Sequence, residues 1–503
     1  MSTLLIGALA LAIVFRYLYR GLLNPLSHIP GPPLSRWTDI AVSYYWLKGK
    51  KTVYVDELHK QYGPVVRIAT NEVDICDVGA ARAIHRTGGR FMKSEWYRLL
   101  IPRPFENVFS TPDPHLHSSR RRLLASPLSD TSLTRFEPQI RHMVQLAISQ
   151  MSCEMKVKGS VDVFKWWLFM ATDIIGELSF GESFRMLENG EKNQYSHDLE
   201  YLGSLAPIRT TFPSLIKIGA ILPLPIFSKA VQAGTRVHEY ARESVARHKS
   251  LVAKDSSNAK STLFTKLDDA GEKGLSEHET CSEARGYIVA GSDTTAVTLT
   301  YLVYAVCRDS HIRDRLVSEL MSLPEDFTDR HARNLPYLNQ VINETLRLYT
   351  AVPGVLPRVV PEEGVQLAGF NFPRGTIVST QAYSMHRDED IFPEPLTFNP
   401  ERWAAPTKAM KDASLPFGGG SRSEYLAKTN RFIEVEANNS VRVEKVCLGI
   451  HLARIELRLA TSLFFRAFPS VKMSTHEGMC DDDMEMASYF LLSPKGHQCL
   501  VEL

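Results

Sequence analysis

The sequence contains few cysteines and no closely spaced pair of them. Its seven cysteines are Cys76, Cys153, Cys281, Cys307, Cys447, Cys480 and Cys499. An odd, dispersed set without a C-x-x-C pair argues against a disulfide framework and against a zinc site, and it favours a reducing compartment. A lone cysteine with special chemistry stays open as an alternative.

Several other features are absent. The 503 residues carry a net charge of +2 and no basic stripe of the kind that follows phosphates, so nucleic acid is not an expected partner. There is no internal repeat and no low-complexity tract. With 44% hydrophobic and 23% charged residues, the composition is that of a globular protein.

The first 23 residues suggest a membrane anchor. Residues 4–15 are small and apolar, and Arg16 and Arg20 follow them. Residues 1–23 reach the roughly 20 residues that span hydrocarbon if both arginines snorkel to the interface. Because the charge follows the apolar stretch, an uncleaved anchor is favoured over a signal peptide or a buried helix. The positive-inside bias then places the rest of the chain in the cytosol.

After the anchor, residues 24–38 include the sequence HIPGPP, which predicts a stiff, proline-rich hinge. Residues 39–503 are predicted to form a mainly α-helical body with small β-sheets near both ends, an α+β fold. The expected elements are a hairpin over residues 62–78, mostly helices over 115–350 with a long apolar helix over 283–308, strands over 364–379, a helix over about 448–467 and a final hairpin over 487–503.

Residues 290–295, AGSDTT, break the helical pattern in the middle of the long apolar helix. A glycine there costs roughly 1 kcal/mol against alanine, and a local rule broken at one spot is a hint of function. Ala290 and Thr294 share a face, with Asp293 beside them. Small residues leave room for a flat cofactor, while a hydroxyl and a carboxylate are placed to pass protons. The alternative is a helix–helix contact in which the Thr hydroxyl bonds to the preceding turn.

Two further motifs carry arginines. Glu344 and Arg347 in ETLR have i, i+3 spacing, which alone means little because such pairs are common on solvated helices. FNPERW supplies Arg402 in a proline-bounded segment that can turn back onto the helix, so an Arg–Glu–Arg cluster is predicted. In HLHSSRRRLL, His117 and Arg121 share a helical face. Three successive arginines usually mark a solvated face, but guanidinium groups also grip carboxylates.

The segments FGGGSR, residues 417–422, and VCLG, residues 446–449, look like one motif cut in two. Joined, they form a tight loop that delivers the thiol of Cys447 to a helix N-terminus, which favours a thiolate. A thiolate held this way is an axial haem ligand. A phosphate-binding loop is excluded because no Lys-Ser/Thr follows the glycines.

Together these motifs resemble those of the haem-thiolate monooxygenases, the cytochrome P-450 superfamily, and particularly its membrane-anchored fungal enzymes of secondary metabolism. The resemblance depends on the order of AGSDTT, ETLR, PGVLPR, FNPERW and the cysteine loop, and it covers nearly the whole chain. It implies the cytochrome P-450 fold, haem b as cofactor, and a single-pass location in the endoplasmic reticulum membrane with a cytosolic catalytic domain. Electrons would come from an NADPH–cytochrome reductase, with cytochrome b5 as a further candidate.

The resemblance also implies roles for single residues. Cys447 would be the axial ligand of the haem iron, and Thr294 and Asp293 would organise protons for dioxygen cleavage. The other haem contacts would be Phe417, Arg422, Arg358, Arg121, Ala290, Gly291 and His117, the last at a position where the family often has Trp. Glu344, Arg347 and Arg402 would form the structural triad.

Substrate contacts are expected from mostly apolar stretches of the chain. They are residues 97–109, residues 206–222, Ile288, residues 352–356 and the surroundings of Phe490. On this reasoning the substrate is a hydrophobic small molecule, such as a terpenoid or polyketide, that is hydroxylated or otherwise oxidised. A family member that rearranges its substrate without oxygen is disfavoured by AGSDTT.

Residues 423–445 depart from the family pattern, which keeps the arginine and the cysteine two residues apart. Closing a loop of this length costs only about 3 kcal/mol beyond a constant term, so folding of the body is not excluded. However, an axial ligand must be held within about 0.5 Å by its surroundings. The alternative to an active monooxygenase is therefore a catalytically inactive polypeptide in which haem is lost or misligated.

We interpret the insert as an unspliced intron translated in frame. Its length, 23 codons, suits a short fungal intron. Ser423-Glu424-Tyr425 can be encoded with a donor-like GTGAGT, Ala437-Asn438 with a branch-like GCTAAC, and Lys445-Val446 with an AG. The competing interpretation is a genuine family-specific loop.

Overall fold

The computed structural model describes residues 7, 11–12, 14–15, 18–19, 21–86, 89–101, 106–215, 225–254, 262–263, 275–419 and 446–503. Arg422 and the insert 423–445 lie outside the described residues. Among the residues described, no helix has the length and apolar character needed to cross a membrane. The anchor over residues 1–23, much of which is not described, stays a prediction.

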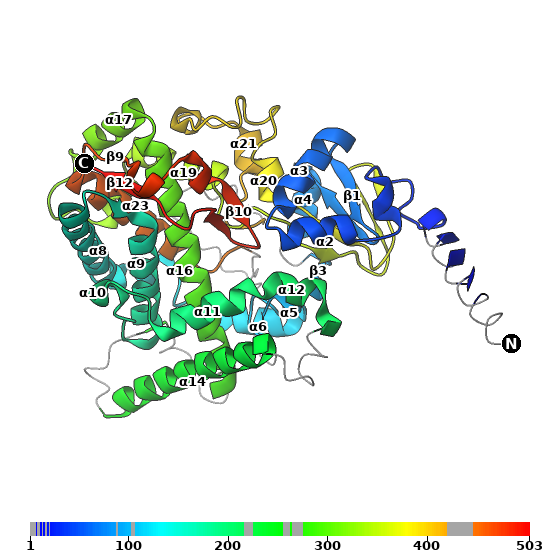
Figure 1. Ribbon diagram of the computed structural model, residues 1–503, viewed down its shortest axis with the longest axis horizontal. Helices are drawn as coiled ribbons and strands as arrows, with labels where there is room; N and C mark the ends of the chain where they lie inside the picture. The colour runs from blue at the N-terminus through cyan, green and yellow to red at the C-terminus, as the bar shows by residue number, and fades with distance from the viewer. Residues whose placement is uncertain are drawn as a thin grey trace, which may run out of the picture.

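One long helix, α16 (Glu277–Cys307), runs through the helical part of the molecule (Figure 1). It begins at a capping box, in which Ser276 and Glu279 each accept a hydrogen bond from the other's backbone N–H. It packs most extensively against α9 (Val163–Phe180) and also contacts α23 (Ile450–Ala467). The two helices predicted over 283–308 and about 448–467 are therefore present as α16 and α23.

The remaining helices surround these elements. They are α2 (Ile40–Leu47), α3 (Lys51–Tyr62), α4 (Val78–His85), α5 (Trp96–Leu100), α6 (Pro114–Ala125), α7 (Asp130–Leu133), α8 (Glu137–Lys158), α10 (Met186–Asn189), α11 (Gln194–Ser204), α12 (Ala206–Thr211), α14 (Pro225–Lys254), α17 (Ser310–Leu320), α18 (Asp329–Arg333), α19 (Pro336–Leu348), α20 (Ala382–Met385) and α21 (Lys408–Ala413), with 3₁₀ turns at Pro33–Arg36, Thr134–Phe136, Pro400–Trp403, His476–Gly478 and Asp481–Met484.

A five-stranded sheet joins strands from residues 65–93 to strands from residues 358–379, in the order β1-β2-β8-β5-β3. The strands are β1 (Val65–Ala69), β2 (Glu72–Ile75), β3 (Met92–Lys93), β5 (Arg358–Val359) and β8 (Ile377–Ser379). The hairpin predicted over residues 62–78 is confirmed, since β1 and β2 pair antiparallel. Two of the strands expected over residues 364–379, β6 (Val365–Leu367) and β7 (Phe370–Phe372), form a separate hairpin, and β8 joins the sheet.

The predicted C-terminal hairpin is only partly right. Strands β10 (Met486–Ser488) and β11 (Leu492–Pro494) pair as expected. The last strand, β12 (Leu500–Glu502), instead lies between β4 (Val161–Asp162) and β9 (Lys472–Met473). The chain turns away at His497, whose φ of 52° is in the left-handed region, so the final residues tie the end of the chain to the start of α9.

The largest hydrophobic core lies among α8, α9, α16, α19 and α23. Trp167 is fully buried, and its ring meets Phe464 edge-on with 5.6 Å between centroids. Gly291 is part of this packing, because a Cβ there would lie 3.0 Å from Ile175 Cγ1. The core therefore fixes α16 against α9 and α23. It thereby also fixes the distance between α16 and the loop that precedes α23.

Candidate functional site

Residues 289–294 of α16 border a cavity of about 1500 Å³. Val289 is 39% exposed although it lies inside the central helix. The Thr294 hydroxyl donates to the Ala290 carbonyl oxygen over 2.6 Å, so it is bonded to the preceding turn. The Thr294 hydroxyl oxygen can still accept a hydrogen bond from a group in the cavity. The back-bonded geometry and a cavity-facing hydroxyl thus occur together.

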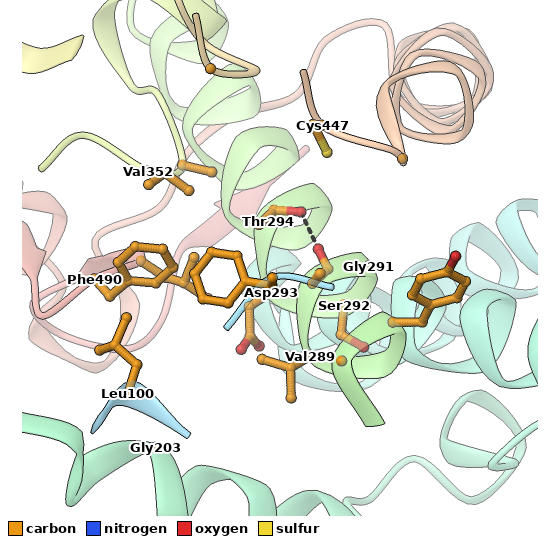
Figure 2. A pocket seen from close by; sticks show the side chains of 18 of the residues that line it. Leu100, Gly203, Val289, Gly291, Ser292, Asp293, Thr294, Val352, Cys447 and Phe490 are labelled. Atoms are coloured by element: carbon orange, nitrogen blue, oxygen red, sulfur yellow. Dashed lines mark hydrogen bonds between the residues drawn. The ribbon is translucent and has the colours of Figure 1, made fainter. Parts of the chain in front are cut away.

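Asp293 lies beside Thr294 on the same turn (Figure 2). Burial raises the pKa of its carboxyl to about 6, and the charge of Glu200 on α11 acts in the same direction while Lys192 acts against it. Lys192 and Glu200 form an ion pair with each other. The Asp293 carboxyl therefore titrates near neutral pH, as a proton-exchanging group must.

Cys447 faces this stretch of α16 from the loop before α23. Figure 2 shows it pointing toward the part of the helix that carries Gly291 and Thr294. Its backbone N–H donates to the Phe417 carbonyl oxygen over 3.0 Å, so the two halves of the divided motif are hydrogen-bonded to each other. Desolvation by the surrounding protein raises the pKa of the thiol although Cys447 is exposed to the cavity, whereas the Gly449 N–H and the charge of Arg121 lower it.

The predicted Arg–Glu–Arg cluster is assembled. Arg347 and Glu344 are fully buried, with Arg347 Nη2 donating to Glu344 Oε1 over 2.8 Å and Nε to Oε2 over 2.9 Å. Arg402 Nε donates to Glu344 Oε1 over 3.0 Å. Trp403 Nε1, which the sequence did not single out, adds a bond of 2.9 Å to Glu344 Oε2. This Glu344 cluster lies in the core rather than on a solvated helix face.

His386 connects the Glu344 cluster to the cysteine loop. One ring nitrogen, Nδ1, lies 2.8 Å from the Arg347 carbonyl oxygen, and Nε2 lies 2.8 Å from the Leu415 backbone nitrogen. The Leu415 N–H can donate only to an unprotonated Nε2, so Nδ1 carries the proton. Burial lowers the pKa of His386 to about 3, in agreement with this neutral form. A neutral histidine thus holds the segment that leads into Phe417.

Three residues predicted to contact haem, His117, Arg121 and Arg358, border the cavity. Arg121 Nη2 donates to the Val446 carbonyl oxygen over 2.5 Å, next to Cys447. Arg358 is buried, stacks over the Tyr97 ring at 5.2 Å, and its Nε has no hydrogen-bond partner in the described part of the chain. An orphaned guanidinium N–H in a cavity that also exposes a thiol fits the propionate and the iron of a haem.

The cavity exceeds the roughly 300–1,000 Å³ of common ligand sites, which leaves room for a prosthetic group and a substrate. Of the predicted substrate contacts, those that line it are Tyr97, Leu100, Ile101, Asn107, Val108, Phe109, Ala206, Pro207, Ile208, Arg209, Ile288, Val352, Leu356 and Phe490. Residues 102–105 and 216–222 lie outside the described residues. Phe109 and Phe490 meet with their ring centroids 5.5 Å apart, which gives the cavity an aromatic wall.

The arginine run shows both arrangements that the sequence left open. Arg122 is exposed, but Arg120 is buried and donates to Glu279 Oε1 over 2.9 Å and to the Glu106 carbonyl oxygen over 2.7 Å. Its guanidinium reaches the first turns of α16, where Glu279 supplies the counter-charge. The neighbouring Glu283 accepts the Val108 N–H over 2.8 Å, and burial raises its pKa to about 7.

The sequence reasoning also missed Glu456 on α23. Thr295 Oγ1 donates to Glu456 Oε2 over 2.8 Å, while Oε1 has no partner in the described part of the chain. Burial raises the pKa of this carboxyl to about 8. A signal was present, because Glu456 lies at i+4 from Leu452 and i−4 from Ala460, both buried, and so falls on the core stripe of its helix.

A mainly helical chain that presents one thiol, preceded by a glycine-rich loop, to a Thr- and Asp-bearing helix across a large cavity defines a haem-thiolate protein. Comparison with known proteins supports this class. The Cytochrome P450 family model matches residues 30–427, and the chain belongs to this family. It is accordingly a monooxygenase with haem as cofactor. The match ends inside the segment 423–445, before Cys447.

Individual relatives agree. The chain is 48% identical over 505 residues to the cytochrome P450 monooxygenase tazI of Aspergillus terreus, covering 100% of this chain and 99% of the relative. It is 44% identical over 485 residues to the cytochrome P450 monooxygenase orf2 of Aspergillus niger, covering 96% and 94%. Among solved structures, retinoic acid-bound cyanobacterial CYP120A1 has a TM-score of 0.65 at 21% identity, over 88% of this chain and 92% of that one, which shows the shared fold.

Proposed function

We propose that the chain oxidises a hydrophobic small molecule of fungal secondary metabolism, of the terpenoid or polyketide type, by inserting one atom of dioxygen. The observation that carries the proposal is that one cavity is bordered by Cys447, in the loop before α23, and by Asp293 and Thr294 on α16. The apolar and aromatic lining supports a hydrophobic substrate. The similarity to Aspergillus monooxygenases supports the pathway type.

Within this proposal, Cys447 ligates the haem iron, and Arg358, Arg121 and His117 hold the propionates together with Arg422. Phe417 packs beside the ligand. When bound, the haem supplies the activation of dioxygen, driven by electrons from a reductase. Family members use such a redox partner, and an NADPH–cytochrome reductase, with cytochrome b5 as a further candidate, is the donor we propose.

The chain's own residues then handle protons. Asp293, with a pKa of about 6, exchanges protons with the Lys192–Glu200 side of the cavity at neutral pH. The Thr294 hydroxyl, held by the Ala290 carbonyl, offers its free lone pair to a hydrogen-bond donor in the cavity. The rings of Tyr97, Phe109 and Phe490 pack together as an apolar wall of the cavity, against which a hydrophobic substrate would lie.

The test is the reduced, CO-bound absorption spectrum of the full chain. A thiolate-ligated haem gives a red-shifted Soret band, so the full chain is expected to show it and Cys447→Ser to lose it. Seryl oxygen is close in size to sulfur but does not give the thiolate spectrum. A Cys447→Ser protein with an unchanged band would show that another group ligates the iron.

For location, we propose a single-pass anchor over residues 1–23 in the endoplasmic reticulum membrane, with the hinge 24–38 and the catalytic body on the cytosolic side. The full chain should sediment with microsomes and resist carbonate extraction. A chain that begins at residue 24 should be released. Equal behaviour of the two chains would refute the anchor.

A second candidate is an inactive polypeptide, and one observation favours it: the family match stops at residue 427, inside the segment 423–445. The same spectrum decides between the candidates when it is recorded on the full chain and on a chain lacking residues 423–445. A band in the trimmed chain alone supports inactivity and the retained-intron interpretation. A band in the full chain and none in the trimmed chain would show that the segment is a genuine part of the enzyme.

A further inference from the structure

Arg209, on α12, is a half-buried cation that lines the same cavity. Its Nε donates to the Leu99 carbonyl oxygen over 2.7 Å, Nη2 donates to that of Leu100, and Nη1 approaches that of Leu202 at 3.5 Å. All three partners are neutral carbonyls. They cap the end of α5, but they leave the positive charge of the guanidinium uncompensated.

No acidic side chain in the described part of the chain influences Arg209. Desolvation alone lowers the pKa of its guanidinium, to about 10. Glu95 and Glu106, on either side of α5, are both paired with Arg98. Glu200, which also lines the cavity, is paired with Lys192. Residues 201–238 contain no Asp or Glu, and neither do the undescribed residues 102–105. The described residues therefore supply no counter-charge to Arg209.

Two of the five guanidinium N–H donors of Arg209 have no partner among the described residues. The position of Arg209 in the cavity follows from the carbonyl groups that it binds. Leu100 is one of these partners and Gly203 follows another, Leu202, and both lie on the far side of the cavity from Cys447 (Figure 2). Between them lie apolar and aromatic residues such as Val352 and Phe490.

From this arrangement we propose that Arg209 is a substrate-binding residue that pairs with an acidic oxygen, a carboxylate or an ionised phenol or enol, at one end of an otherwise apolar substrate. The charge is fixed at the far end, and the apolar body extends toward Thr294. The inference rests on the proposed function, because it assigns a substrate class to that same cavity. It predicts that removing the acidic group from the substrate costs affinity, since the half-buried cation is then left without a counter-charge.

The test measures binding rather than turnover. Isothermal titration of the full, haem-loaded chain compares dodecanoate with methyl dodecanoate, two probes of equal chain length that differ in charge. The wild-type chain is expected to bind the acid at least ~10-fold more tightly than the ester, and Arg209→Gln to reduce that ratio to about 1. Arg209→Lys keeps the charge and should retain part of the preference. Arg122→Gln, an exposed arginine on α6, is the matched control and should leave the ratio unchanged.

The outcomes are distinct. A wild-type chain that binds acid and ester equally, or an acid preference that persists in Arg209→Gln, overturns the proposal. If Arg209→Gln does not fold because α5 loses its cap, the wild-type ratio and the Arg209→Lys ratio still decide. Failure of the proposed function would appear elsewhere, as a missing thiolate band in the same preparation. The titration can also be made on the haem-free chain, so the two failures are separable.

Discussion

At the scale of single residues, the Thr294 hydroxyl donates a hydrogen bond to the preceding turn of its helix and also borders the cavity. We predict that Thr294→Ala lowers product formed per NADPH consumed by about 10²-fold, the low end of what a positioned proton-transfer group contributes. Thr294→Ser keeps the hydroxyl and should retain most of the coupling. The measurement is product yield against NADPH oxidation. An Ala variant that remains fully coupled would remove Thr294 from the proposed mechanism.

Glu456 gives a second residue-scale prediction, on pH. Burial raises the pKa of its carboxyl from 4.5 to about 8, so the folded chain favours the protonated form. The resulting stabilisation is fully present below about pH 4.5 and is lost as the pH rises through about 8. Urea unfolding should therefore show the free energy of unfolding of the wild type, relative to Glu456→Gln, falling by about 2–4 kcal/mol between pH 5.5 and 8.5.

The control for this pH series is Glu277→Gln, because Glu277 is exposed on the first turn of α16. Its difference from the wild type should not vary with pH. A wild-type-minus-Glu456→Gln difference that is constant with pH would mean that Glu456 keeps an ordinary pKa in the folded state.

These two residues also show what can be read from a sequence at this scale. Thr294 and Cys447 each lie in a short motif whose residue types indicate a functional site. Glu456 has no motif of its own, and only its place on an apolar stripe marks it. Its partner Thr295 lies 161 positions away, and Glu283 bonds a backbone N–H 175 positions away. Contacts of this kind depend on how helices pack, which no local pattern specifies.

At the scale of elements, local signals predicted the long helix, the β1–β2 hairpin and the helix after the cysteine. Each has a short-range cause: the capping box of Ser276 and Glu279 begins α16, Gly63-Pro64 precedes β1, and Pro469 follows the end of α23. The C-terminal hairpin was partly wrong because β12 finds its partners in β4 and β9, more than 300 residues away in the case of β4. Strand pairing over such a separation leaves no local trace.

The Glu344 cluster joins α19 to the turn Pro400–Trp403, and its stability is testable. Glu344→Gln leaves Arg347 and Arg402 without a counter-charge in a buried site, and breaking such a pair costs about 3–5 kcal/mol. The midpoint of urea unfolding should fall accordingly. Lys408→Met, which removes an exposed pair with Asp412, is the control and should leave the midpoint nearly unchanged. Equal effects of the two substitutions would mean that the cluster does not stabilise the fold.

At the scale of the whole molecule, the question is how the two halves of the cysteine loop come together. The Cys447 N–H bonds the Phe417 carbonyl although residues 423–445 separate them in the chain, and His386 holds the first half through Leu415. These contacts do not use the intervening segment. Removing it should therefore leave the anchor points of the loop in place.

We predict that the chain lacking residues 423–445 binds haem at least as completely as the full chain and unfolds with a free energy about 1–2 kcal/mol larger, because a shorter loop costs less entropy to close. Haem occupancy from the Soret absorbance and urea unfolding of both haem-free chains measure the two quantities separately. His386→Asn serves as the control for the comparison of haem occupancy. Because this substitution loosens Leu415, it should lower haem occupancy in both chains. If trimming lowers both occupancy and stability, residues 423–445 are an integral part of the folded enzyme, and the hydrogen bond between Phe417 and Cys447 depends on them.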